Sequence, residues 1–150
     1  MVANPLKKPM GRRGRMRGLT LVELMITLAI VAILGTIAYP MYTGYAQRSR
    51  RSDAWQALST AQAQMEQCYS QYFAYNNASC AVTTASPSGY YQVQIASSTS
   101  ASAYTLTATP TSPGLQTADT SCSSFSVGNG GIRSALTSQG ADSSSTCWPH

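Results

Sequence analysis

The feature that most constrains this 150-residue chain is an apolar run close to its N-terminus. From Leu19 to Tyr39, 16 of 21 residues are apolar. A helix rises about 1.5 Å per residue, so a helix of this length covers about 32 Å, close to the thickness of the hydrocarbon core of a bilayer. The sequence therefore predicts a helix that spans a membrane. Glu23 is the one charged residue in this run, and a charge at mid-membrane costs about 2.5–3.5 kcal/mol on insertion scales, which indicates a function for its carboxylate.

A basic segment precedes the apolar run. Residues 1–18 contain six Lys or Arg, two prolines and three glycines without hydrophobic periodicity, so we expect this leader to be flexible. Its positive charge predicts a cytoplasmic N-terminus by the positive-inside rule. An ordinary signal peptide or a plain membrane anchor is the alternative, but the apolar part of a signal peptide is usually shorter, about 7–15 residues.

The residues from Gly18 to Glu23 read GLTLVE. Together with the apolar residues that follow, they resemble the processing motif of type IV prepilins and of their type II secretion relatives. The resemblance is close over residues 18–50, and Pro40 falls where pilin helices commonly carry a proline. It implies that a prepilin peptidase cuts after Gly18 and methylates the new N-terminus at Leu19. The commonest first residue in the family is phenylalanine, so Leu19 is a departure that bears on how well the site is cut.

Cleavage at this bond creates a cationic amine on Leu19, one helical turn from Glu23. We expect Glu23 to pair with this amine on a neighbouring subunit, because an unpaired buried ion costs several kcal/mol and such pairing penalises every other axial register in a fibre. Pairing within one chain is the alternative.

Past Tyr39 we expect the helix to continue through Pro40, where the lost backbone hydrogen bond predicts a kink. From Arg48 to about Tyr75, apolar residues recur at spacings of three and four, which predicts one buried helical stripe. The stripe consists of Ala54, Leu58, Ala61, Met65, Cys68 and Tyr72.

Positive charge is concentrated in the leader. The formal net charge is +5, but residues 19–150 contain four arginines and five acidic residues, so the pI is no argument for nucleic acid, which we do not expect as a partner. The cluster of Arg48, Arg50 and Arg51 with Asp53 lies where the helix should leave the lipid. We expect this cluster to contact headgroups or a neighbouring subunit.

The composition changes after Cys80, since residues 81–150 contain 27 Ser or Thr. Apolar and polar residues alternate in residues 91–95, 104–108 and 124–127, and turn residues flank each run. The sequence predicts an α+β fold in which a long N-terminal helix packs against a small antiparallel sheet of three to four strands, with a disulfide-bounded C-terminal loop.

Four cysteines, Cys68, Cys80, Cys122 and Cys147, allow three pairings. Their positions along the predicted elements favour Cys68 with Cys80 and Cys122 with Cys147. The resemblance to pilins, many of which have a disulfide-bounded C-terminal region, adds support to the second pair. A zinc site is not expected, because C-x-x-C is absent and the single histidine is the last residue, His150.

Four aromatic residues, Tyr69, Tyr72, Phe73 and Tyr75, follow closely on one another. We expect them to pack against the sheet, and we expect Trp148 to cover the edge of the C-terminal loop. No phosphate-binding glycine loop or cluster of candidate acids and bases is present in the sequence. The chain is therefore not expected to be an enzyme or to need a cofactor.

The resemblance to prepilins implies a structural subunit of a type IV pilus, and the four cysteines and the Ser/Thr-rich, charge-poor head resemble the minor pilins more than the principal subunit. Its domains are a leader (1–18), a transmembrane and polymerisation helix (19–46) and a head exported past the inner membrane (47–150). The expected partners are prepilin peptidase, other pilin subunits with the assembly machinery, and inner-membrane lipid before assembly into a fibre at the cell surface. A type II secretion pseudopilin and a DNA-receptor pilin are the alternatives.

Overall fold

The computed structural model describes residues 18–149. Residues 1–17 of the leader, with their expected flexibility and orientation, lie outside the described residues, and so does His150. Contacts within the chain divide it into two units, Met1–Pro40 and Met41–His150.

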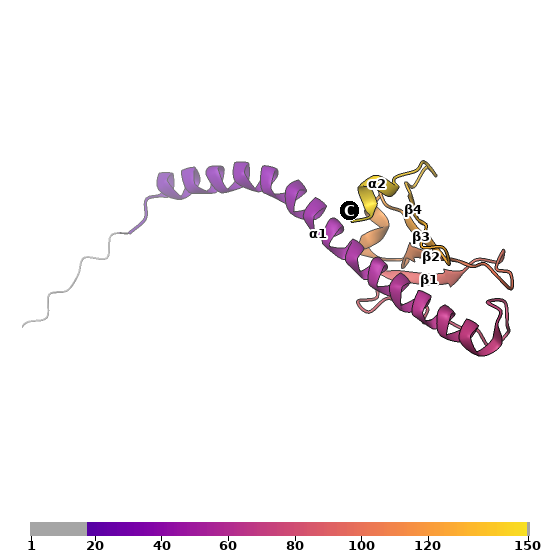
Figure 1. Ribbon diagram of the computed structural model, residues 1–150. Coiled ribbons are helices and arrows are strands. Elements are labelled where there is room, and N and C mark those ends of the chain that lie inside the picture. Colours follow the sequence, from indigo (N-terminus) through magenta and orange to yellow (C-terminus); the bar gives the residue numbers. More distant parts are fainter. Residues whose placement is uncertain (1–17, 150) are drawn as a thin grey trace, which may run out of the picture. The chain divides into compact units, whose positions relative to one another are not determined.

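Helix α1 (Leu21–Tyr72) is 52 residues long and contains Pro40 in its interior, so the helix continues through the proline as predicted (Figure 1). Its start is set by Thr20. The Thr20 hydroxyl accepts a hydrogen bond of 3.1 Å from the backbone N–H of Glu23, which satisfies one of the unpaired donors at the first turn.

In the first unit, the residues of α1 from Leu21 to Pro40 are all exposed. The most apolar window of the helix has a mean hydropathy of 2.4, and none of it is buried. Monomeric soluble proteins rarely expose an apolar surface of this size, and one that is exposed marks contact with a membrane or another protein. By length and composition, this part of the helix is able to cross a membrane.

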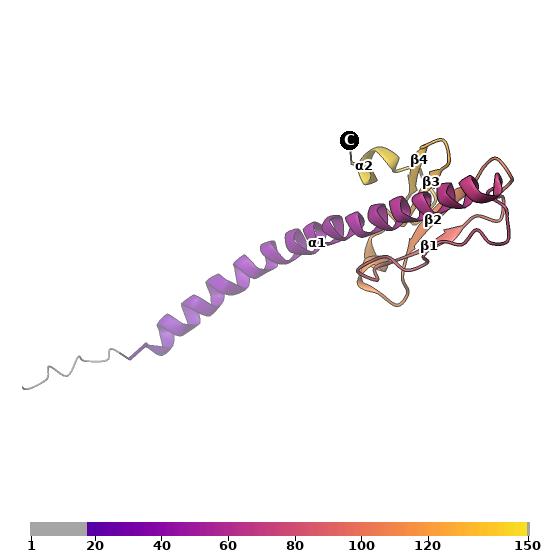
Figure 2. The same ribbon diagram turned by 60° about the horizontal axis from the view of Figure 1, so that its bottom comes forward.

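In the second unit, four antiparallel strands form a meander in the order β1-β2-β3-β4, which confirms the predicted sheet (Figure 2). The strands are β1 (Tyr91–Ile95), β2 (Thr105–Pro110), β3 (Ser124–Gly128) and β4 (Arg133–Leu136). Val93 pairs with Ala108, which pairs with Phe125, so the buried residues form rows across the sheet. Gln and Thr residues alternate with them and face away from the helix.

The core lies between this sheet and the second half of α1. The predicted stripe is buried from Ala54 to Cys68, and Leu58 and Met65 are each at most 1% exposed. Burying a side chain of this size contributes about 1.5–3 kcal/mol. Tyr72 departs from the prediction, because it ends α1 and is 44% exposed.

Strand β4 is one of the two edges of the sheet, and the C-terminal segment covers it. The N–H of Ser143 donates to the carbonyl of Ala135 (2.8 Å), and the N–H of Ala135 donates to Oγ of Ser144 (2.9 Å). Ser144 also begins the short helix α2 (Ser144–Cys147). Pairing the exposed edge in this way protects it from association with another chain.

Candidate functional site

The residues of the predicted cleavage site precede helix α1. Gly18, Leu19 and Thr20 are exposed and lie outside regular secondary structure, so the bond after Gly18 is accessible. A Cβ atom built on Gly18 would meet no atom within 4 Å. The folded chain therefore has room for a larger side chain at this position. If glycine is needed here, the need comes from a partner that binds this segment.

Glu23 lies in the first turn of α1. The N-terminus of a helix carries a partial positive charge, so an acid is favoured there and a new cationic amine is disfavoured. In the part of the chain that the structure describes, the carboxylate of Glu23 has no ion-pair partner. The predicted pairing of Glu23 with an amine on Leu19 thus remains a prediction that concerns the cleaved protein.

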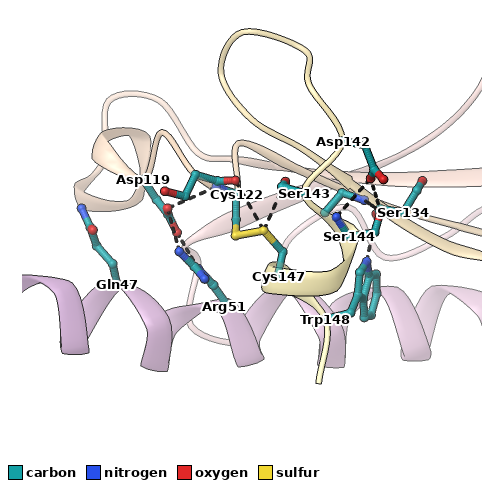
Figure 3. The surroundings of a disulfide bond; sticks show 12 residues. Gln47, Arg51, Asp119, Cys122, Ser134, Asp142, Ser143, Ser144, Cys147 and Trp148 are labelled. Atoms are coloured by element: carbon teal, nitrogen blue, oxygen red, sulfur yellow. Dashed lines mark hydrogen bonds and ion pairs between the residues drawn. A yellow bond between two sulfur atoms is a disulfide. The ribbon is translucent and has the colours of Figure 1, made fainter. Parts of the chain in front are cut away.

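In the head, the second unit, Arg51 and Asp119 form a buried ion pair (Figure 3). The guanidinium donates from Nε to Oδ2 (2.7 Å) and from Nη2 to Oδ1 (3.0 Å), and the two side chains are 10% and 2% exposed. Asp119 also accepts bonds from Nε2 of Gln116 and from the N–H of Cys122. The expectation that Arg51 contacts headgroups or a neighbouring subunit is therefore wrong, because its charge is neutralised inside the head.

Asp53 is also buried, at 6% exposure, so its expected place in a surface cluster is wrong. Its carboxylate accepts hydrogen bonds from the hydroxyl of Ser86 and from the N–H groups of Ser88 and Tyr90. These bonds hold the loop before β1 onto α1. Of the predicted cluster, Arg48 remains exposed, and Arg50 is half-buried with its guanidinium 5.2 Å from the ring centroid of Tyr90.

Two disulfides are present, with the pairing that the sequence favoured. Cys68 on α1 is bonded to Cys80 in the following loop, and Cys122 is bonded to Cys147 in α2. The second bond lies beside the Arg51–Asp119 pair (Figure 3) and holds the C-terminal segment to the residues that precede β3.

Trp148 follows this disulfide and is the centre of an aromatic group. Its indole N–H donates to the carbonyl of Ser134 (2.9 Å), and its ring is stacked on Trp55 with 6.3 Å between centroids. The guanidinium of Arg133 lies 5.2 Å from the Trp148 ring centroid. A pocket of about 170 Å³ beside this ring is also lined by Arg48. The fold thus brings two exposed arginines, 85 residues apart in the sequence, to one aromatic surface.

At the other end of the head, Glu66 accepts hydrogen bonds from the hydroxyls of Tyr75 and Tyr104, each 2.9 Å long. Burial raises the pKa of Tyr75 to about 12, and the hydrogen bond to Glu66 acts in the same direction. Burial likewise raises the pKa of Tyr104. The expectation that the whole aromatic cluster packs against the sheet is wrong, because Tyr75 is buried whereas Phe73 is 78% exposed.

Comparison with known families decides what kind of protein carries these features. Residues 13–39 match the prokaryotic N-terminal methylation motif. Residues 40–126, more than half of the chain, match a family described as "Type IV minor pilin ComP, DNA uptake sequence receptor". The chain belongs to this family of type IV minor pilins. The resemblance to prepilins in the sequence is thereby confirmed.

Curated relatives of this minor pilin match it over short stretches. The fimbrial protein EcpC of Eikenella corrodens is 41% identical over 54 residues, which are 36% of this chain and 35% of EcpC. The type IV major pilin protein PilA of Myxococcus xanthus is 49% identical over 51 residues, which are 32% of this chain and 23% of PilA. The matched stretch is thus about a third or less of each relative's length.

A solved structure confirms the pilin fold of the chain. The non-core minor pilin PilV of Neisseria meningitidis aligns with a TM-score of 0.54 at 22% sequence identity, covering 65% of this chain and 93% of PilV. At this identity the likeness concerns the fold, which is the long helix and antiparallel sheet that the sequence predicted.

The minor pilin contains site features that its sequence did not predict. The Arg51–Asp119 pair joins residues 68 positions apart, and the Arg133–Trp148 contact joins a strand to the C-terminal segment. Neither pair has a spacing that marks it in a sequence. The clearest available signal was the scarcity of charge after Cys80, because a lone acid such as Asp119 in a neutral region is a candidate for a structural role.

Proposed function

We propose that this minor pilin is a structural subunit of a type IV pilus that is cut after Gly18, methylated at Leu19 and anchored in the inner membrane before assembly. The observation that carries the proposal is the exposed apolar surface of α1 from Leu21 to Pro40. Such a helix can move from lipid into a bundle of similar helices with little change in solvation. Prepilin peptidase, other pilin subunits and the assembly machinery are its partners in this proposal.

Glu23 gives this assembly its register. Cleavage leaves a cationic amine on Leu19 just ahead of the helix, at the positive end of the helix dipole, so the amine is stabilised by a nearby carboxylate. In an apolar bundle each unpaired ion costs several kcal/mol, which favours the axial position in which Glu23 of one subunit meets the amine of another.

The test compares Glu23→Val with Thr27→Val, a change that also removes a polar group from the same helix but no charge. We expect both variants to be inserted and cut, and Glu23→Val to enter sheared fibres at least about tenfold less than wild type, because 1.4 kcal/mol already corresponds to a factor of ten. Equal amounts of the two variants in fibres would contradict the register role. Gly18→Val tests processing separately and should leave the uncut chain in the inner membrane.

A second function, DNA binding, is favoured by the match to a family of DNA uptake sequence receptors. We propose that two arginines beside Trp148 contact the phosphates of duplex DNA: Arg48, which lines the pocket next to it, and Arg133, whose guanidinium lies over its ring. Both arginines are exposed, whereas Arg51 is neutralised by Asp119. Two cations predict weak binding with a shallow salt dependence, so the slope of log K against log salt should be about −1.8.

The measurement is DNA binding by the leader-free chain, since the six basic residues of the leader would bind DNA by themselves. Arg133→Ala and Arg48→Ala should each make the slope shallower by about 0.9. Arg50→Ala is the matched control, because positions 48 and 50 lie on opposite sides of a helix and Arg50 contacts Tyr90. If Arg50→Ala has the same effect as Arg48→Ala, the proposed surface is wrong.

A further inference from the structure

A groove of about 210 Å³ lies between the last turns of α1 and the loop around Cys80, where Ser79 and Ala81 line it. A disulfide and a pair of hydrogen bonds hold its two walls together. The Cys68–Cys80 disulfide joins helix to loop. The side chain of Gln64 exchanges two hydrogen bonds with Thr83, one from Nε2 to Oγ1 (2.8 Å) and one from the N–H of Thr83 to Oε1 (2.7 Å). The groove is therefore preformed.

The polar groups that line this groove are all uncharged. Gln64, Gln67 and Gln71 supply side-chain amides, Ser79 a hydroxyl and Tyr72 a phenol, and no charged residue lines the groove in the described part of the chain. An amide offers two donors and two acceptor positions, so Gln64 retains one N–H and one lone pair beyond its bonds to Thr83. This lining suits a neutral ligand with many hydroxyl groups and gives a phosphate or a carboxylate no counter-charge.

Tyr72 adds an aromatic surface to the groove. It is the last residue of α1 and is 44% exposed. Phe73, the residue after the helix, has a positive φ of 55°, which is uncommon for a bulky side chain. The negative face of an aromatic ring attracts the weakly positive C–H groups of a ligand. A ligand ring with polar groups at its edge and C–H groups on its face therefore fits this groove, because its edge can bind the amides and its face can pack on Tyr72.

We propose that this groove binds a neutral saccharide, with the sugar ring on Tyr72 and its hydroxyl groups on Gln67 and Gln71. The groove contains neither Arg48 nor Arg133, so the inference is independent of the proposed DNA surface. Fibre assembly through the apolar part of α1 is likewise not required for it.

The test uses the full chain in micelles of a phosphocholine detergent, because a detergent with a sugar headgroup would occupy the groove. The probes are neutral di- and trisaccharides of glucose, galactose and N-acetylglucosamine, with sialylated and sulfated counterparts. Saturation-transfer NMR should show transfer to ring protons of at least one neutral probe with a Kd below about 10 mM. The affinity should be insensitive to salt, because no ion pair forms.

Variants locate the site. Tyr72→Ala and Gln71→Ala should each weaken saccharide binding at least fivefold. Tyr72→Phe keeps the aromatic ring and should retain binding. Gln94→Ala, on the outer face of β1, is the matched control and should bind like wild type. Gln71 is exposed on a helix, where alanine is favourable, so this variant carries the test even if Tyr72→Ala fails to fold. The proposal is overturned if no neutral probe binds, if charged glycans bind better, or if Gln71→Ala binds like wild type.

Discussion

Removing the positive charge of the Arg51–Asp119 pair should destabilise the head strongly. In Arg51→Met, Asp119 stays buried with two hydrogen bonds, from Gln116 and from the backbone of Cys122, but without its counter-ion. Breaking a buried pair by removing one partner costs about 3–5 kcal/mol. Because the second unit has about 110 residues, each kcal/mol should lower its melting temperature by about 4 °C, which gives a fall of more than 10 °C.

The companion variants separate the charge effect from lost packing. Asp119→Asn removes the negative charge and should also be destabilising, because it leaves the Arg51 guanidinium unpaired. The double variant Arg51→Met/Asp119→Asn leaves no charge at this site, so its loss should be smaller than the sum of the single losses by about 2–3 kcal/mol. Arg50→Met is the matched control, since Arg50 is half-buried beside Tyr90 and should cost less than about 1 kcal/mol.

Denaturant unfolding of the detergent-solubilised chain, followed by tryptophan fluorescence, measures these differences. Trp55 and Trp148 both line the pocket to which Arg51 also contributes, so they report on this region directly. The reasoning is refuted if Arg51→Met costs no more than Arg50→Met, or if the single losses add to the double loss within about 0.5 kcal/mol.

Two further predictions concern the disulfide and the tyrosines. Replacing Cys122 and Cys147 together by serine removes a bond across 25 residues and should lower the free energy of unfolding of the head by about 3.5 kcal/mol. In limited proteolysis, new cleavage should be confined to the C-terminal segment, and uniform cleavage would contradict this. The pKa of Tyr75 is raised to about 12 in the folded head, so its hydroxyl stays protonated there at a pH at which the same tyrosine ionises in the unfolded chain. The contribution of Tyr75 to the stability of the head is therefore complete below about pH 10 and is lost as the pH rises towards about 12. Unfolding midpoints of wild type and Tyr75→Phe should converge over this interval, and a constant difference would refute it.

The local features of this minor pilin followed from the sequence because they depend on neighbours along the chain. The apolar run from Leu19 to Tyr39 predicted a helix by length and composition, and the spacing from Ala54 to Cys68 predicted its buried face. Alternation predicted three strands in the same way. Strand β4 was not located, because it has four residues of which one, Ala135, is buried, and such a short pattern carries little signal.

Tertiary structure decided which charges act at the surface and which are internal. In the sequence Arg48, Arg50 and Arg51 form one basic cluster, but the helix points them in different directions, and a loop 68 residues away supplies Asp119 to one of them. The fold likewise placed Arg133 on Trp148 and left Tyr72 exposed at the end of α1. Periodicity along one helix fixes a face, whereas the partner of a side chain on that face depends on how distant segments pack. The sequence by itself therefore determined the long helix with its apolar run and three of the four strands, and only the packing of distant segments determined the ion pair, the two arginines beside Trp148 and the groove.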